Sequence, residues 1–256
     1  MIFNHSGALG DILYSLTFAR EYSLSKDSPM IGLNLQVGVP TQSNPQDSRT
    51  VLMSKESADW LKPLLVAQPY IHMVTVDPRE PQSALNLSRV RRLPLFHSAG
   101  DIRYYYYCLV GDALPKDFAK PVLDVTPDPR SKDRVIVFRS ARYHNPFVNY
   151  NEFRHLQSKL LFLGLPEEHE AFCKEWFKVE YLAVKDALEA ARLIKGASLT
   201  LGNQTCLFAI AEQLKVPRVL ESAQVLKQGG ALIYGCPNVL PVGGDCKMWV
   251  ASPKID

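Results

Sequence analysis

A carboxylate and two glycines stand close together near the start of the chain. They belong to the stretch His5-Ser6-Gly7-Ala8-Leu9-Gly10-Asp11, which follows the apolar, strand-like run Met1-Ile2-Phe3. Apolar residues then recur at helical spacing, at Ile12, Leu13, Leu16 and Ala19. A strand, a glycine-bearing turn and a helix bring backbone N–H groups close to a ligand. We therefore interpret the stretch as a functional loop, against the alternative that Asp11 is an ordinary helix N-cap.

A second polar turn, which contains two arginines, follows a strongly apolar strand in the middle of the chain. The strand is Arg134-Val-Ile-Val-Phe138, and the turn begins Arg139-Ser140-Ala141-Arg142. A guanidinium group binds phosphate through two parallel hydrogen bonds, so this turn is a candidate phosphate site. A solvated basic loop is an equally weighted alternative.

The elements that would position these residues alternate between strands and helices. Strands are expected at 31–39, 71–76, 134–138, 159–163 and 197–201 and from 219, with helices after residue 11, from 54, at 103–111, from 166, at 186–195 and at 207–214. This alternation predicts an α/β fold with mainly parallel sheets. Four prolines between 115 and 129 mark the best candidate for a linker. We therefore expect a domain at 1–120, a linker at 121–133 and a second domain at 134–256.

Four consecutive tyrosines, Tyr104–Tyr107, lie in the helix expected at 103–111. Together they cover all sides of a helix, and tyrosine packs well with its ring buried and its hydroxyl group in water. We favour this packing interpretation over the alternative that one tyrosine lines a binding site.

Composition excludes several classes of protein. The 256 residues are 46% hydrophobic and carry a formal net charge of only +3, which argues against a highly basic nucleic-acid-binding protein. No apolar run approaches the length of a membrane span and the N-terminus lacks a secretory-signal pattern, so we expect a cytoplasmic protein. The five cysteines and six histidines form neither a C-x-x-C nor an H-x-x-x-H pattern. We therefore predict reduced thiols and no metal site.

Three separated segments are similar to one family, the heptosyltransferase-like glycosyltransferases of family nine. Gly7–Asp11 followed by Ile12–Leu16 resembles the opening loop of that family. Lys159–Gly164 followed by Pro166-Glu167-Glu168 resembles its strand, glycine and acidic helix. Lys195–Pro217, which includes Gly202-Asn203-Gln204-Thr205, resembles its signature turn and helix. The three segments have the family's order and spacing, and they span most of the chain.

The resemblance implies a GT-B fold, in which two Rossmann-like domains face each other across a cleft. It implies transfer of a sugar from a nucleotide-sugar donor to an acceptor hydroxyl, with inversion and without a metal or another cofactor. Asp11 would be the catalytic base, and Ser6, Gly7 and Gly10 would form the acceptor-side loop. The donor would bind at Arg139, Ser140, Arg142, Gly164, Gly202, Asn203, Gln204, Thr205 and Glu221, with Glu221 accepting hydrogen bonds from a ribose. The acceptor is expected to be a glycan, a small molecule or a nucleic acid.

The signature turn departs from the family pattern at three positions. Gln204 replaces a usual aspartate, Cys206 a glycine and Ala209 a histidine. These changes motivate an alternative function, a catalytically silent GT-B module that binds a nucleotide sugar or a partner protein. A third possibility is a glycosyltransferase that acts on modified DNA bases, because Arg89, Arg91 and Arg92 form a local basic patch. Such a patch is more often a solvated face.

Overall fold

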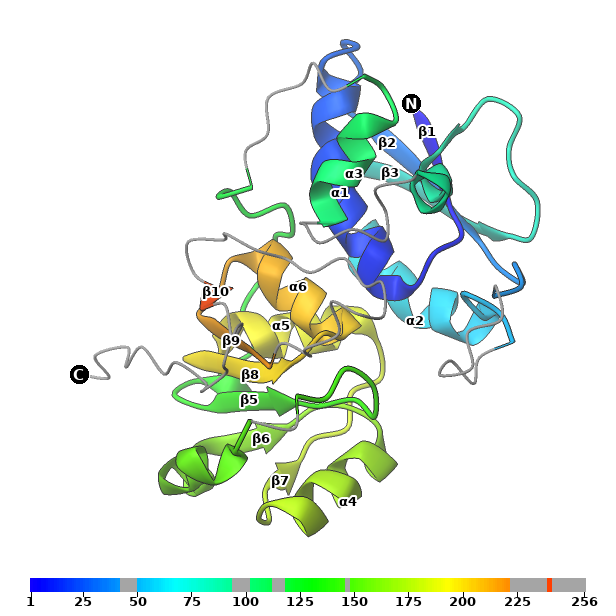
Figure 1. The fold of residues 1–256 in the computed structure, drawn as a ribbon. Coiled ribbons are helices and arrows are strands. Elements are labelled where there is room, and N and C mark those ends of the chain that lie inside the picture. Colours follow the sequence, from blue (N-terminus) through cyan, green and yellow to red (C-terminus); the bar gives the residue numbers. More distant parts are fainter. Residues whose placement is uncertain (42–49, 94–101, 112–117, 146–147, 222–238, 241–256) are drawn as a thin grey trace.

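The structure, a computed structural model, describes residues 1–41, 50–93, 102–111, 118–145, 148–221 and 239–240 (Figure 1). It contains two sheets in which every strand pair is parallel. The prediction of an α/β fold with parallel sheets is therefore confirmed.

The first sheet has the strand order β3-β2-β1-β4. Its strands are β1 (Ile2–His5), β2 (Ile31–Gln36), β3 (Ile71–Asp77) and β4 (Leu85–Asn86). The accompanying helices are α1 (Leu9–Leu24), α2 (Lys55–Val66), the 3-10 helix η1 (Leu87–Arg92) and α3 (Ile102–Cys108). Ser54 caps α2, with its side chain accepting a hydrogen bond from the Ser57 amide.

The second sheet has the order β10-β9-β8-β5-β6-β7. Its strands are β5 (Val135–Phe138), β6 (Leu160–Phe162), β7 (Glu180–Tyr181), β8 (Leu199–Asn203), β9 (Arg218–Glu221) and β10 (Val239–Leu240). The helices are η3 (Pro129–Ser131), η4 (Tyr150–Lys159), α4 (Pro166–Glu175), α5 (Ala187–Gly196) and α6 (Cys206–Leu214). Numbered from β5, the order reads 3-2-1-4-5-6, the arrangement of a Rossmann fold, in which ligands bind at the carboxyl ends of the strands.

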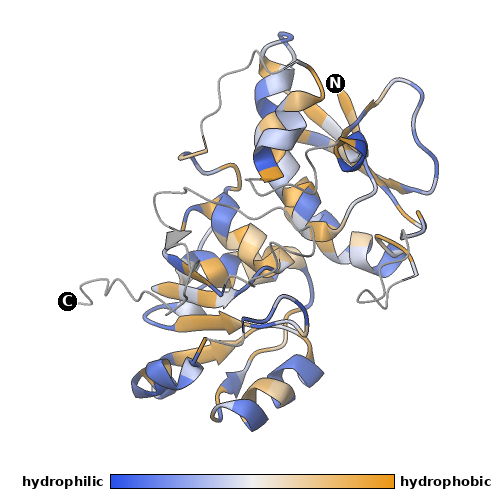
Figure 2. Cartoon of the chain, viewed as in Figure 1, coloured by the Kyte–Doolittle hydropathy of each residue, from blue (hydrophilic) through white to orange (hydrophobic). Residues whose placement is uncertain are grey.

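Helices from both halves lie together between the two sheets (Figure 1). Helix α1 packs on α6, and α2 packs on α5. One hydrophobic core therefore runs through both halves, from Phe3 and Leu33 of the first sheet to Ile194 of α5 and Phe208 of α6. Hydrophobic residues are concentrated on the strands of the second sheet and on α6 (Figure 2).

Buried polar contacts reinforce this junction. Arg103 of α3 donates a hydrogen bond to Glu212 of α6 at 2.6 Å, with side chains that are 2% and 0% exposed. The Gln213 side-chain amide donates to the backbone oxygen of Leu13 in α1 at 2.9 Å. Removing one partner of a buried ion pair is strongly destabilising, because the other charge stays buried without compensation. The two halves are thus joined by specific contacts as well as by apolar packing.

One face of the first sheet carries a ladder of amide side chains. Asn34 donates to Asn4 at 2.8 Å and to the carbonyl oxygen of Arg79 at 3.0 Å. Gln36 donates to the carbonyl oxygen of Pro78 at 3.1 Å. The connection between β3 and β4, residues 78–84, contains no helix, so these amides satisfy backbone groups that a helix would satisfy internally.

Two local predictions are corrected by the structure. Gly202 and Asn203 are the last residues of β8 and are not part of a turn. Ala8 occupies the N-cap position of α1 and Asp11 lies in the first turn, so Asp11 is not an N-cap.

The predicted linker, 121–133, is packed against both halves. Val122 and Leu123 are buried in the shared core, and their amides donate to the backbone oxygen of Gln213 at 2.9 and 3.2 Å. The Asp124 amide donates to the side-chain oxygen of Gln68 in the first half. The strands of the first sheet lie at 2–86 and the second sheet begins at Val135, while the domain limits themselves stay a prediction.

We expect the two halves to unfold in one transition, because they share a core. Trp60 of α2 reports on the first half, and Trp176, directly after α4, reports on the second. Each is studied in a variant in which the other two tryptophans are changed to phenylalanine. Urea midpoints from the two fluorescence signals should coincide, and Leu193→Ala in α5 should lower both midpoints together by removing about 2–5 kcal/mol. Two midpoints that separate would contradict the shared core.

Candidate functional site

The two glycine-containing segments predicted from the sequence meet where the first turns of α1 and α6 touch. A methyl group added at Gly10 would lie 3.8 Å from Ala209 Cβ and 3.9 Å from Cys206 Cα, which is ordinary van der Waals contact. Ala209 and Cys206 are two of the three positions that depart from the family pattern. Small side chains there leave room for α1 to approach α6 closely.

A buried hydrogen-bonded chain lies beneath the first loop. The Gly7 amide donates to His5 Nδ1 at 2.9 Å, so the ring proton of neutral His5 sits on Nε2. Nε2 then donates to the Tyr106 hydroxyl at 3.0 Å. The Tyr106 hydroxyl donates to the backbone oxygen of Asp11 at 2.8 Å. The chain connects the end of β1, helix α3 and the first turn of α1.

Burial keeps His5 neutral. It lowers the pKa of the imidazole from 6.5 to about 4, against an opposing effect of the Asp11 charge, and Arg91 adds to the lowering. Burial also raises the pKa of Tyr106 well above its usual value. Both side chains therefore serve as fixed hydrogen-bonding groups at neutral pH.

The Asp11 side chain forms an ion pair with Arg91 of η1. The two side chains are 19% and 30% exposed, so the pair lies at the rim of the structure and not in its core. Next to it, Ser6 uses its amide and its hydroxyl group to reach the Ser88 hydroxyl oxygen at 2.6 and 2.9 Å. The loop after β1 and the helix after β4 are thus fastened together at the carboxyl edge of the first sheet.

On the second sheet, Arg139 and Glu221 bind each other. Arg139 Nε and Nη2 donate to the two Glu221 oxygens at 2.9 and 3.2 Å, and both side chains are buried. Glu221 also accepts hydrogen bonds from the Tyr150 hydroxyl and the Asn145 amide, both at 2.9 Å. Four donors therefore surround the Glu221 carboxylate. A ribose hydroxyl or a phosphate would have to compete with this network, and the donor-binding roles of Arg139 and Glu221 stay predictions.

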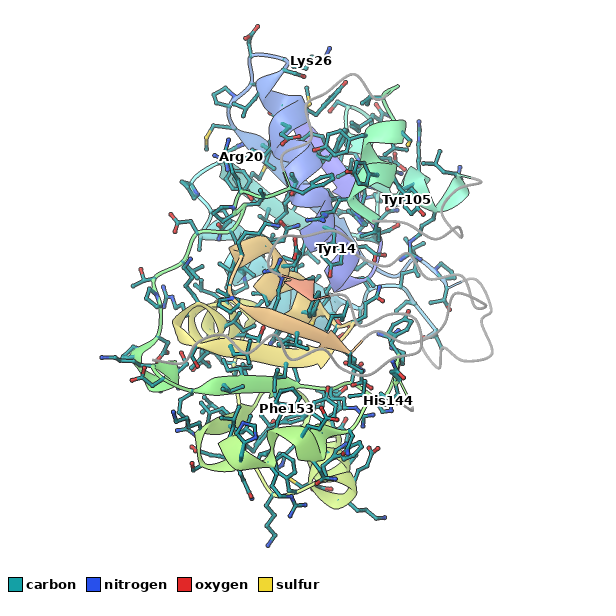
Figure 3. The ribbon with its side chains drawn as sticks, turned by 60° about the vertical axis from the view of Figure 1, so that its left-hand side comes forward. Tyr14, Arg20, Lys26, Tyr105, His144 and Phe153 are labelled. Atoms are coloured by element: carbon teal, nitrogen blue, oxygen red, sulfur yellow. The ribbon has the colours of Figure 1, made fainter. Side chains whose placement is uncertain are left out.

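Asn203 shapes the loop that follows β5. Its side chain accepts a hydrogen bond from the Ser140 amide at 3.0 Å and donates to the backbone oxygens of Ser140 and Arg142 at 2.9 and 2.5 Å. In this loop, Arg142, Tyr143 and His144 are exposed to solvent. Figure 3 shows His144 at the end of the second sheet. Tyr143 has a φ of +58°, a conformation that bulky residues rarely adopt and that is concentrated at functional sites.

Two of the predicted glycines are required by close packing. A Cβ at Gly202 would lie 2.0 Å from the Phe138 oxygen of the neighbouring strand. Gly164 has a φ of +154°, and a Cβ there would lie 2.9 Å from Glu168 Oε2. These contacts give both glycines a structural reason, whereas their donor-binding roles stay predictions.

The starts of α4 and α6 complete the edge of the second sheet. Thr205 caps α6, its hydroxyl accepting a hydrogen bond from the Phe208 amide at 3.2 Å, and Gln204 precedes it in a bend. Glu168 accepts one from the Leu165 amide at 3.0 Å at the start of α4. Burial raises the pKa of Glu168, and burial followed by the Glu168 charge raises the pKa of the Cys206 thiol to about 11. Glu168 and Cys206 therefore lie near each other.

A cavity of about 150 Å³ lies between the loop after β5 and α4. Its lining residues are Arg139, Ala141, His144, Glu167, Glu168, Ala171, Phe172 and Glu175. It is smaller than the pockets that hold drug-sized ligands, which begin near 300 Å³.

Sequence reasoning missed three contributions to the site. His5 and Tyr106 were not identified as supports of the Asp11 turn, although the strand position of His5 and the tyrosine run were visible. Tyr105, Tyr106 and Tyr107 are buried and Tyr104 is 47% exposed, so the packing interpretation holds for most of the run. Arg91 was treated as part of a basic patch, although it binds Asp11.

Solved structures of glycosyltransferases resemble this chain. The E. coli heptosyltransferase WaaC with ADP superposes with a TM-score of 0.55 and 10% identity, covering 86% of each chain. The E. coli ADP-heptose lps heptosyltransferase II superposes with a TM-score of 0.54 and 15% sequence identity, and the match covers 91% of each chain. The chain has a GT-B-type fold. The glycosyl transferase family 9 structure from Veillonella parvula DSM 2008 superposes with a TM-score of 0.54 and 14% sequence identity. That match covers 93% of this chain and 85% of the Veillonella chain.

These likenesses establish the fold and agree with the heptosyltransferase-like resemblance of the sequence. No protein-family model and no curated protein matches the sequence. Among the described residues, no helix has the length and apolar character needed to cross a membrane. In that same part of the chain, no three His, Cys, Asp or Glu side chains are grouped so that they could hold a metal ion.

Gly7→Ala should destabilise the protein by about 1–3 kcal/mol, because the new methyl group would lie 2.5 Å from His5 Cε1 and 3.0 Å from Asp11 Oδ2. Gly10→Ala is the matched control, since its methyl group meets no atom closer than 3.8 Å. Urea unfolding measures both variants. Equal stability of the two would contradict the tight packing of His5 under Gly7.

Stability should depend on pH through His5. Above pH ~6.5 the ring is neutral in both states, whereas between ~6.5 and ~4 only the unfolded chain binds the proton. The free energy of unfolding should therefore fall as the pH decreases, by up to about 3 kcal/mol near pH 4. His5→Asn keeps an acceptor for the Gly7 amide but cannot titrate. Urea unfolding of the wild type and of His5→Asn at several pH values isolates the contribution of His5 to stability. Parallel plots of unfolding free energy against pH for the two proteins would refute the prediction.

Proposed function

We propose that this protein is a glycosyltransferase that moves a sugar from a nucleotide-activated donor to an acceptor hydroxyl. The observation that carries the proposal is that the carboxyl edge of the first sheet lies next to the carboxyl edge of the second. The first turn of α1, with Asp11, lies against the first turn of α6 at the end of a Rossmann-type sheet. This contact supports the proposal because it would bring the proposed base of one half close to the proposed nucleotide site of the other. The GT-B fold shared with heptosyltransferases supports the same conclusion.

In the proposed reaction Asp11 is the base. The acceptor oxygen attacks the anomeric carbon from the face opposite the leaving group, so the configuration inverts. The proton of that hydroxyl moves to the Asp11 carboxylate, and the bond from the anomeric carbon to the diphosphate oxygen breaks with its electron pair. The nucleoside diphosphate leaves, and no metal or other cofactor takes part.

On the donor side, Ser140 and Arg142 and the N-terminus of α6 at Gln204 and Thr205 are proposed to hold the diphosphate. Helix N-terminal amides and guanidinium groups both favour phosphate oxygens. Asn203 supports this role by fixing the Ser140–Arg142 backbone. WaaC with ADP among the structural neighbours makes an adenosine diphosphate sugar the first donor to test.

The proposed alternatives differ in what they require of the site. A silent module that binds a nucleotide sugar or a partner protein would keep the fold without turnover, and Gln204, Cys206 and Ala209 motivate this alternative. Transfer to modified DNA bases would require the basic patch to bind phosphates. In that case turnover would fall steeply with salt.

Asp11→Asn should lower turnover by about 10²–10⁴-fold, because the acceptor proton then has no base to accept it. Nucleotide binding should survive, since the donor site lies on the other half. ADP-heptose and a panel of other nucleotide sugars serve as probes, with thermal shift reporting binding and nucleotide release reporting turnover. Asp59→Asn, an exposed change in α2, is the control. Unchanged turnover in Asp11→Asn would remove Asp11 from the mechanism.

A further inference from the structure

The six residues of the 3-10 helix η1 lie in three different environments. A 3-10 helix has three residues per turn, so residues three apart lie on the same face. Leu87 and Val90 are buried in the core, at 0% and 1% exposure. Ser88 and Arg91 form the next face and contact the loop after β1. The third face, Arg89 and Arg92, is exposed to solvent.

The basic patch seen in the sequence is therefore two different features. Arg89 and Arg92 are solvated side chains, whereas Arg91 turns inward and donates to Asp11 Oδ2. The two hydrogen bonds between Ser88 and Ser6 hold η1 against the loop after β1. Burial of Leu87 and Val90 fixes which face of η1 is turned toward the core. Arg91 thus reaches Asp11 from a firmly anchored element.

The carboxylate of Asp11 has one engaged oxygen and one available oxygen. Arg91 binds Oδ2, and Oδ1 accepts no hydrogen bond from any residue that the structure describes. Oδ2 also lies 3.0 Å from the position that a Gly7 Cβ would occupy, so the carboxylate lies directly over the loop. The groups beneath it, His5 and Tyr106, are uncharged at neutral pH. Arg91 is therefore the charged side chain in contact with the carboxylate.

We propose that Arg91 is the positioning residue for the base. It holds Oδ2 of Asp11 so that Oδ1 is presented to the acceptor hydroxyl, and it keeps the carboxylate in one orientation during the reaction. The proton of the acceptor moves to Oδ1, while Arg91 stays protonated and bound at Oδ2. This inference rests on the proposed function, because it assigns Arg91 a role through Asp11.

The turnover test compares three arginines of one short helix. ADP-heptose is the probe, with water as the acceptor and release of ADP as the measurement. Arg91→Met should lower kcat by about 10²-fold with little change in KM for the donor, because a base displaced by about 1 Å loses that much rate. Arg91→Lys should recover a large part of kcat, since it restores the charge. Arg89→Met and Arg92→Met remove the same charge from the exposed face and should keep kcat within about twofold.

A double variant separates positioning from direct binding. In an Asp11→Asn background, Arg91→Met should cause no further loss of kcat, because residues that act as one unit are non-additive. A further loss of similar size would show that Arg91 acts on the substrate independently of Asp11 and would overturn the inference. Equal losses in all three arginine variants would also overturn it, in favour of a general effect of the patch.

A stability cycle tests the contact without any turnover. Urea unfolding of the wild type, Asp11→Asn, Arg91→Met and the double variant should give about a fivefold coupling in the unfolding equilibrium constant. Absence of coupling would overturn the inference. Coupling in a protein that releases no nucleotide from any donor would instead refute the proposed function, while supporting the Arg91 contact. The two failures are thereby distinguishable.

Discussion

The packing of α1 on α6 is the contact on which the rest of the structure depends. It brings Gly10 within van der Waals reach of Ala209 and Cys206, so the first turns of the two helices meet at the carboxyl edges of both sheets. The shared core and the buried Arg103–Glu212 ion pair hold this arrangement. Because each half covers the apolar helices of the other, the position of one loop relative to the other is set by core packing.

The Asp11 loop is supported from below by neutral groups and from the side by a charge. His5 and Tyr106 are buried, and their hydrogen bonds fix backbone atoms of Gly7 and Asp11. Arg91 holds the carboxylate itself. A base that is fixed in this way needs little rearrangement before it meets a substrate, which is the physical advantage of preorganised groups.

The donor side shows how far residue types can predict a site. Arg139 and Glu221 were candidates for phosphate and ribose because each stands at the carboxyl end of a strand. In the structure β5 and β9 lie on either side of β8, and the two opposite charges bind each other. No sequence pattern reports this pairing, since the residues are 82 positions apart. Asn203 was named only as a candidate for donor binding, and the structure shows that its side chain holds the backbone of the loop after β5.

The sequence by itself determined the local elements: the strand, glycine loop and helix around Asp11, the parallel α/β class, and the helix at 207–214. These follow from apolar periodicity and glycine positions, which act within a few residues. Only the tertiary structure decided that Arg91 turns inward, that Tyr106 supports the loop, and that the two sheets share one core. Those features depend on contacts between residues far apart in the chain, and such contacts are set by how the helices pack.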